Sequence, residues 1–304
     1  MAQPHRRLIA LGYNLDVELT GLDKLTIDPK NGTGDWLDFN IPLERVFERA
    51  AEWKKAVTGV DKPWLCWNIS PRWCVLQQRL VQAVGWTPIV GFDPRIGPPP
   101  VLPGSVLINF NESFDFPVMW MHFPMEFAFL WATRLAFWHS DLICRLPLME
   151  KLAKMFESLE DGQMAAVLDK GGRRNWLNFK SHRYWELCGC TTAGASENQF
   201  YNGTGWWRPL WLHPKCRVSA EQRRRRSYQW DHGAGILYWQ NNYNGPVIPI
   251  DLYAIKEGHC SEIMSKNYKN LPNHFTALRD LPTELDLNYN IETAAQKLGI
   301  AHLL

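Results

Sequence analysis

Long hydrophobic runs are missing from this 304-residue sequence, and their absence limits where the protein can work. No stretch of about 18 uncharged apolar residues is present, which is the length that a membrane-spanning helix needs. The first residues, MAQPHRRLIALGYN, also lack the apolar segment and the small-residue cleavage site of a secretory signal. We therefore expect a protein with no membrane span that is located in the cytoplasm.

Four common catalytic motifs are absent as well. The sequence has no G-x-x-x-x-G-K-S/T phosphate loop, no G-x-G-x-x-G after a strand, no H-E-x-x-H and no G-x-S-x-G. These absences argue against a kinase with a phosphate loop, a dehydrogenase, a zinc protease of the H-E-x-x-H type and an ordinary α/β-hydrolase.

A large excess of one charge is missing too. The chain has 33 Lys and Arg against 31 Asp and Glu, which gives a net charge of +2. Dedicated nucleic-acid binders usually carry a much larger basic excess, so the overall charge argues against that class. The run Arg223–Arg226 is a local exception, which we expect to form a solvated surface patch.

The cysteines do not form the pattern of a disulfide framework. There are 7 of them, an odd number, between Cys66 and Cys260, and we expect reduced thiols. An alternative is a structural zinc site made of His182, Cys188, Cys190, His213 and Cys216. The single residue between Cys188 and Cys190 argues against it, because zinc sites usually separate such cysteines by two to four residues.

Apolar and aromatic residues, by contrast, are abundant. The sequence is 46% hydrophobic and contains 16 tryptophans, enough to form the core of one large domain. Indole rings also stack on sugars and nucleobases, although we expect most of these tryptophans to pack in the core or at its rim.

Short apolar runs alternate with amphipathic helices from residue 63 onward, a pattern typical of a sheet covered by helices. The predicted fold class is α/β, with a mixed, mostly parallel central sheet flanked by helices. Beyond residue 170 the periodicity weakens, and we expect loops and short strands there. The predicted strands are 64–68, 88–92, 106–110, 135–138, 164–168 and 247–255; the predicted helices are 72–84, 125–134 and one from Pro147 to near Gly162.

The same patterns divide the chain into three parts. Residues 1–60 are expected to be an N-terminal extension that packs on the core, with a helix beginning at Pro42. Residues 61–280 are expected to form a single catalytic domain. Residues 281–304 are expected to be a polar tail with one short helix at 291–298.

Polar side chains follow three of the predicted strands, in the clusters Asn68-Ile69-Ser70, Asp93-Pro94-Arg95 and His139-Ser140-Asp141. Ligands of α/β sheets bind beyond the carboxyl ends of the strands, so these clusters meet in one crevice if their strands are neighbours. His139 and Asp141 are both metal-ligand types, and carboxylate and imidazole suit Mn²⁺ or Mg²⁺, the imidazole mainly Mn²⁺. The alternative is that the two side chains only cap the following turn.

The segment LAFWHSDLICRLPLMEKLAKMFESLEDGQMAAVLD resembles the central stretch of GT-A-type glycosyltransferases. In that family a strand ends in a short acidic metal motif, usually Asp-x-Asp, followed by a helix, a glycine and another strand. Here His139 stands at the first position of the motif and Asp141 matches the last. The family's first strand, helix and second strand with a terminal acid map onto 64–93, so the resemblance covers about residues 63–169.

The resemblance implies a Rossmann-like half that binds a nucleotide-sugar donor and a second half that faces the acceptor. A divalent ion, Mn²⁺ or Mg²⁺, would bridge the donor diphosphate to the protein. Its ligands would be His139, Asp141 and a late histidine, for which His259 is preferred over His232. The donor-binding residues would be Asn68, Ser70, Asp93, Arg95 and Ser140, with Arg145 or the Arg223–Arg226 run as further partners of the diphosphate.

The resemblance also implies an acceptor side. Trp206, Trp207 and Arg208 would contact the acceptor, and Asp231 would be the general base, with Glu186 and Glu197 as rivals. The acceptor itself, whether glycan, protein or nucleic acid, stays open.

Two alternative functions remain from the sequence. One is a non-catalytic module that binds carbohydrate or nucleic acid through its tryptophans and arginines. The other is a transferase whose acceptor is a nucleic acid, held by the arginine run beside the donor.

Overall fold

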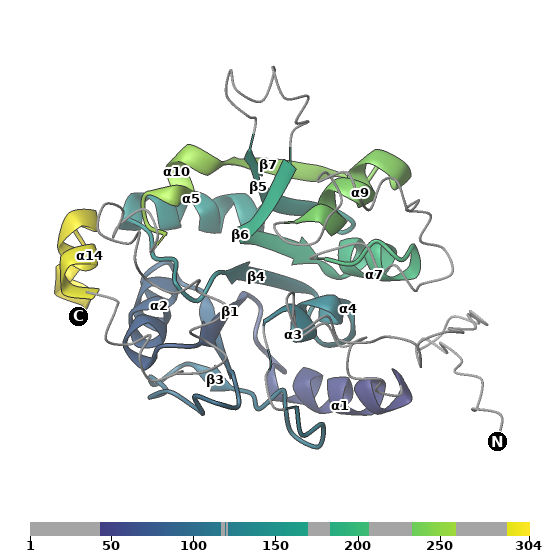
Figure 1. Cartoon of the computed structure of the whole chain (residues 1–304), viewed down its shortest axis with the longest axis horizontal. Coiled ribbons are helices and arrows are strands. Elements are labelled where there is room, and N and C mark those ends of the chain that lie inside the picture. The colour runs from purple at the N-terminus through teal and green to yellow at the C-terminus, as the bar shows by residue number, and fades with distance from the viewer. Residues whose placement is uncertain (1–42, 117–118, 120, 170–182, 207–232, 260–290) are drawn as a thin grey trace, which may run out of the picture.

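The fold was determined from a computed structural model of the whole chain (Figure 1). The structure describes residues 43–116, 119, 121–169, 183–206, 233–259 and 291–304.

The described strands form one seven-stranded sheet in the order β3-β2-β1-β4-β6-β5-β7. β6 runs antiparallel to both of its neighbours, and every other pair is parallel. The sheet is therefore mixed and mostly parallel, which confirms the predicted fold class. The strands are β1 Pro63–Asn68, β2 Thr87–Phe92, β3 Val106–Leu107, β4 Arg134–Trp138, β5 Met164–Asp169, β6 Arg183–Thr192 and β7 Val247–Asp251.

Helices cover both faces of the sheet (Figure 1). On one side α2 packs against α5, and on the other α1, α4, α7 and α9 contact one another in turn. Strands buried on both faces are mostly apolar, as in β1, whose six residues are all buried and all apolar except Asn68 at its end. The helices are α1 Leu43–Ala56, α2 Pro71–Ala83, α3 His122–Glu126, α4 Ala128–Trp131, α5 Leu146–Glu157, α7 Ala193–Tyr201, α9 Ala234–Tyr243, α10 Leu252–Lys256 and α14 Ile291–Leu298.

Tryptophans fill much of the core on both faces. Trp64 of β1 contacts Phe156 of α5 at a ring-centroid distance of 5.2 Å. Trp67, three residues later and on the opposite face, lies 6.0 Å from Phe110. Apart from Trp185, every tryptophan in the described ranges is buried, which agrees with the expectation that most of them pack in the core.

The sequence-based element boundaries up to residue 169 agree with the structure to within one residue, with three exceptions. The helix expected from Pro147 to near Gly162 already ends at Glu157. The helix expected at 125–134 is divided into α3 and α4, because Phe127 between them has a non-helical conformation with φ −112°. The third strand is only two residues long, Val106–Leu107.

The region beyond residue 170 contains more regular structure than predicted. Instead of short strands, it includes the ten-residue β6 and the helices α7 and α9. β6 pairs with β4 on one side and β5 on the other, and this pairing outweighs the weak periodicity of its sequence. The last strand also ends early, at Asp251, whose side chain accepts a hydrogen bond from the Tyr253 amide of 3.1 Å and caps α10.

Both ends of the described chain join the same core. Val46, Ala50 and Trp53 of α1 are buried in it. The predicted helix at 291–298 is present as α14, and its buried residues belong to that core too. Arg72 of α2 forms an exposed ion pair with Glu292 of α14, which lies beside α2 (Figure 1).

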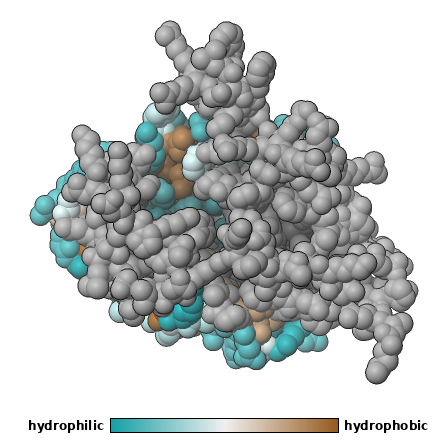
Figure 2. Space-filling view, in the orientation of Figure 1, coloured by the Kyte–Doolittle hydropathy of each residue, from teal (hydrophilic) through white to brown (hydrophobic). Residues whose placement is uncertain are grey.

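The described surface in Figure 2 is mostly hydrophilic, with small hydrophobic areas between. None of the helices in the described ranges combines the length and the apolar character needed to cross a bilayer.

Candidate metal centre

Three polar strand ends lie at one edge of the sheet. β2, β1 and β4 are consecutive neighbours and run parallel, so their carboxyl ends share that edge. The Asp93 amide donates a 3.2 Å hydrogen bond to the Asn68 carbonyl and joins the first two clusters directly. The third cluster follows β4 at the same edge.

The turn after β4 is fixed by backbone contacts and by one buried glutamine. The His139 amide donates to the Leu187 carbonyl at 2.8 Å and prolongs the pairing of β4 with β6. Gln77 of α2 is fully buried, and its Nε2 donates to the carbonyls of His139 and Leu142, both at 2.7 Å. The backbone on either side of Asp141 is therefore anchored to α2.

His259 reaches this turn from a distant part of the sequence. It follows α10 and forms an isolated antiparallel bridge with Leu142. The Ile143 amide donates to the Gly258 carbonyl at 3.1 Å. A Cβ atom at position 258 would lie 1.6 Å from the Ile143 carbonyl oxygen, so only glycine permits this approach.

His139, Asp141 and His259 together form a metal-ligand triad. The Asp141 Oδ1 atom is 3.7 Å from His139 Nδ1, and its Oδ2 atom is 3.3 Å from His259 Nε2. The three offer one ligand atom each within 4.8 Å of one another, and no other such group occurs within the described part of the chain. The Asp141 side chain is 9% exposed, whereas those of His139 and His259 are 23% and 20% exposed.

The spacing and the donor types of the triad both fit a divalent ion. Ligands about 2.1 Å from an octahedral ion lie about 3 Å apart when they are adjacent. The three ligand atoms, which lie within 4.8 Å of one another, would move closer together to reach that arrangement. Two imidazoles and one carboxylate favour a transition metal such as Mn²⁺ over Mg²⁺, which prefers oxygen ligands.

Glu186 of β6 lies beside the triad. Its Oε1 atom is 3.5 Å from His139 Nε2, on the side of the imidazole ring opposite the nitrogen that faces Asp141. The Glu186 side chain is 5% exposed, so its carboxylate faces His139 and not an open acceptor surface. This placement gives little support to Glu186 as the general base.

The polar side chains at the ends of β1 and β2 form hydrogen bonds and ion pairs with other groups of the protein. Asn68 is fully buried, and its Nδ2 donates to the Gly97 carbonyl at 2.8 Å. Asp93 is also fully buried, and the Arg95 guanidinium donates to it through Nε at 2.9 Å and a terminal nitrogen at 2.7 Å. Asp93 and Arg95 thus bind each other, which does not favour a direct contact of either one with a nucleotide.

The remaining predicted donor residues lie at the same edge. Ser70 is buried immediately before α2, and Ser140 is partly exposed between two of the triad residues. Arg145 is bound to another part of the protein. Its guanidinium donates to Glu257 at 2.6 and 3.1 Å, and this contact lowers the pKa of the Glu257 carboxyl.

The predicted acceptor residues are only partly described. Trp206 is 2% exposed, packs edge-on against Phe137 at 4.8 Å and donates its backbone amide to the Glu126 carboxylate at 3.0 Å. This placement makes Trp206 a core residue and not an open stacking surface. Trp207, Arg208, Asp231, His232 and the Arg223–Arg226 run lie outside the described residues.

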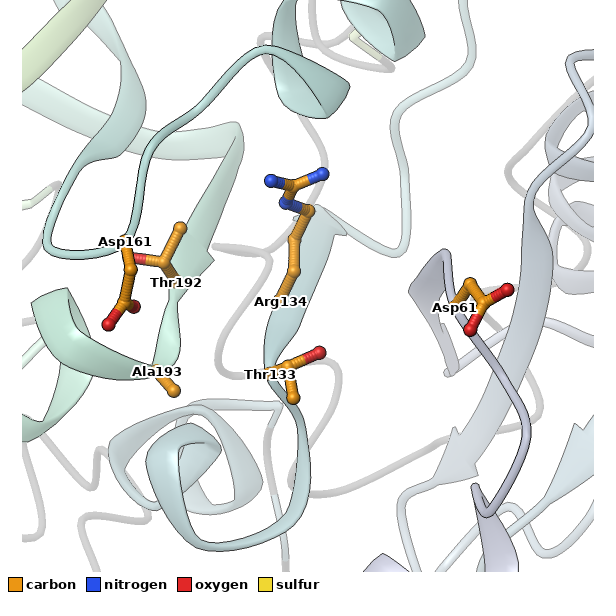
Figure 3. A pocket seen from close by; sticks show the side chains of 6 residues that line it. All are labelled: Asp61, Thr133, Arg134, Asp161, Thr192 and Ala193. Atoms are coloured by element: carbon orange, nitrogen blue, oxygen red, sulfur yellow. The ribbon is translucent and has the colours of Figure 1, made fainter.

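The remaining rival for the base, Glu197, lies on α7 near the opposite edge of the sheet. Burial and then the nearby Asp161 carboxylate raise its pKa. A cavity of about 400 Å³ lies at that edge, and Figure 3 shows the side chains that line it: Asp61, Thr133, Arg134, Asp161, Thr192 and Ala193. The Arg134 guanidinium donates to the carbonyls of Glu157 and Leu159, and the Gly194 amide donates to Asp161, so these charges stabilise the fold.

The two cysteines of the alternative zinc site are fully buried in β6. Burial raises the pKa of both the Cys188 and Cys190 thiols, whereas zinc binding needs thiolates. Its other proposed ligands, His182, His213 and Cys216, lie outside the described residues. The described thiols therefore give no support to a zinc site.

Two residues of the site were not anticipated from the sequence. Gln77 gave no signal, because a polar residue within an amphipathic helix is ordinary. Gly258 precedes a candidate ligand directly, and a glycine at such a place is a recognisable sign of close backbone approach.

Comparisons with known proteins give no match: no family model, no curated protein and no solved structure is significantly similar to this chain.

Proposed function

We propose that the protein is a metal-dependent glycosyltransferase that uses a nucleotide-sugar donor. The observation that carries this proposal is the His139, Asp141 and His259 triad, placed beyond the carboxyl end of β4 and next to the end of β1. A mostly parallel α/β sheet binds its ligands at this edge, and the α/β architecture agrees with the fold that the family resemblance implies.

The triad would hold the ion, and Mn²⁺ is the proposed species. When bound, the ion would supply positive charge to the diphosphate that leaves as the sugar is transferred. Asp141 provides the single carboxylate of the triad, and the two imidazoles add neutral ligands. Ser140 is partly exposed between two ligands, where it can hydrogen-bond a donor phosphate.

Asp231 remains the proposed general base, because the alternatives are placed elsewhere. Glu186 faces His139, and Glu197 lies near Asp161 at the opposite edge of the sheet. A carboxylate within hydrogen-bond reach of the acceptor hydroxyl would take its proton as the hydroxyl attacks the sugar. The acceptor is proposed only as a hydroxyl compound, whether glycan, protein or nucleic acid.

Isothermal titration with a panel of nucleoside diphosphates, with and without Mn²⁺, tests this function. We expect one nucleotide to bind with Mn²⁺ and to lose its binding in Asp141→Ala. The control variant is Asp161→Ala, which removes a carboxylate at the opposite edge and should bind as the wild type does. Failure of every diphosphate to bind would reject the transferase. Binding that persists unchanged in Asp141→Ala would favour a non-catalytic binding module.

The donor set favours a second candidate function. Two histidines and one carboxylate with open positions are also the ligands of non-haem Fe(II) oxygenases. Titration with Fe²⁺ under anaerobic conditions, followed by exposure to O₂ with a 2-oxoacid present, separates the two. Tight Fe²⁺ binding and consumption of O₂ without diphosphate binding would favour the oxygenase.

A further inference from the structure

The two ring nitrogens of His139 face two different carboxylates. Nδ1 is 3.7 Å from Asp141, the neighbouring member of the triad. Nε2 is 3.5 Å from Glu186, which belongs to a different strand. A neutral imidazole has one nitrogen with a lone pair and one that carries a proton, so only one of the two can bind an ion.

An irregularity in β6 brings Glu186 to this position. Along β5 the register passes from Ala166, paired with Gly189, directly to Val167, paired with Trp185. Residues 186–188 of β6 therefore have no partner in β5. On the other side, β4 stays in contact, through the Trp138–Cys188 pair and the hydrogen bond from the His139 amide to the Leu187 carbonyl. Such bulges redirect a side chain, and here the side chain is Glu186.

We propose that Glu186 is a positioning residue that accepts the Nε2 proton of His139 and so presents Nδ1 to the metal ion. The inference deepens the proposed function and rests on its metal site. Metal-binding histidines commonly donate their second nitrogen to a carboxylate, which orients the ring and increases the basicity of the ligand nitrogen. Glu186 therefore acts through His139, and the general base of the reaction lies elsewhere.

NMR can show directly which ring nitrogen of His139 binds the metal ion. Protein labelled with ¹⁵N-histidine would be loaded with ¹¹³Cd²⁺ alone, and the His139 signals, among nine histidines, would be assigned from a His139→Gln spectrum. We expect a ¹¹³Cd coupling to Nδ1 of His139 and a proton on Nε2. A coupling to Nε2 in the wild-type protein would overturn the proposal without any variant.

A matched pair of variants tests the role of Glu186 itself. The amide oxygen of Glu186→Gln still accepts from Nε2, so this variant should keep the Nδ1 coupling and bind Mn²⁺ within about threefold of the wild type. Glu186→Leu has a similar volume but no acceptor, and its Mn²⁺ affinity should be about 10- to 100-fold lower. Wild-type affinity in Glu186→Leu would refute the positioning role. If that variant does not fold, loss of the Nδ1 coupling in Glu186→Gln would refute it.

The outcomes separate this inference from the proposed function. Mn²⁺ binding with the expected Nδ1 coupling, but without any diphosphate binding, would retain the role of Glu186 and reject the glycosyltransferase. Diphosphate binding that depends on Mn²⁺, with ¹¹³Cd coupled to Nε2, would retain the transferase and reject the role of Glu186. No ion binding by the wild-type protein would reject both.

Discussion

The ends of β2 and β4 carry the same kind of residue but use it differently. Each strand leads to a buried aspartate, Asp93 after β2 and Asp141 after β4. Asp93 is bound by Arg95, which follows it by two residues and donates from both its backbone and its side chain. Asp141 instead lies between two histidines, at 3.3 and 3.7 Å.

The difference follows from the chemistry of the neighbours. The arginine guanidinium is always charged and has no lone pair to offer a metal, so it binds the acid in an ion pair and cannot share a metal ion with it. A neutral imidazole offers a lone pair, so two imidazoles and one carboxylate can share an ion. The acid after β2 thus belongs to a structural ion pair, and the acid after β4 is a candidate metal ligand. Substitution of the first should lower stability and not metal affinity, and substitution of the second should do the reverse.

The largest effect is expected at the β2 end, on stability. Asp93→Ala removes the carboxylate that the mostly buried Arg95 guanidinium binds, which should cost about 3–5 kcal/mol of unfolding free energy. The Mn²⁺ affinity should not change, because neither residue belongs to the triad. Urea denaturation and titration with Mn²⁺ measure the two quantities. A variant that keeps its stability but loses Mn²⁺ binding would contradict the comparison.

The reverse is expected at the β4 end. Asp141→Asn keeps the size of the side chain but removes the carboxylate of the triad, so Mn²⁺ should bind at least about 100-fold more weakly. The unfolding free energy should stay within about 1 kcal/mol of the wild type, since no arginine is left unpaired. Urea denaturation and titration with Mn²⁺ measure these two quantities as well. Wild-type Mn²⁺ affinity in Asp141→Asn would rule out the triad as a metal site.

Two adjacent glutamines on α2 sharpen the comparison further. Gln77 donates to the turn that carries Asp141, whereas Gln78 donates to the Pro100 carbonyl and accepts from the Leu102 amide, both at 2.9 Å. Both are fully buried, so replacing either by Met should cost about 1–3 kcal/mol.

Metal affinity should distinguish these two variants. Gln77→Met should weaken Mn²⁺ binding about tenfold, because the ligand turn loses its anchor, whereas Gln78→Met should leave it unchanged. Titration with Mn²⁺ at a temperature where both variants are folded gives the answer. Equal losses of affinity in the two would mean that Gln77 acts only through overall stability.

Much of the β4 end could be predicted from the sequence, because its signals are local. An apolar run followed directly by His139 and Asp141 indicates both the strand and the ligand pair. The fold of residues 63–169 was predictable for the same reason, since each strand and helix has its own period. Within this region, the divided helix at Phe127 was missed, because its sequence continues the apolar pattern across the break.

The remaining parts of the site depend on contacts between distant segments. Glu186 faces His139 because three residues of β6 bulge away from β5, and nothing in the residues of β6 alone indicates that register. Gln77 of α2, a helix that packs against β1 and β2, reaches the turn after β4 only through the tertiary fold. Trp206 was predicted to contact the acceptor, but Phe137 and Glu126 hold it in the core. Tertiary packing decides each of these placements, and a single sequence does not encode it locally.

The smallest effect is expected from the arginine at the β4 end. Arg145 lies four residues after Asp141, yet it pairs with Glu257 at the surface and donates to the Lys297 carbonyl at 3.2 Å. Exposed ion pairs contribute little to stability, so Arg145→Ala should change Mn²⁺ affinity by no more than about twofold and leave the melting temperature nearly unchanged. Arg95→Ala, measured by the same melting and titration experiments, should lower the melting temperature strongly, because the buried Asp93 carboxylate loses its guanidinium and keeps only the backbone amide of residue 95. If Arg145→Ala instead abolishes Mn²⁺ binding, the contact with Glu257 is what positions His259, and the arginines at the two ends are equally important to the structure.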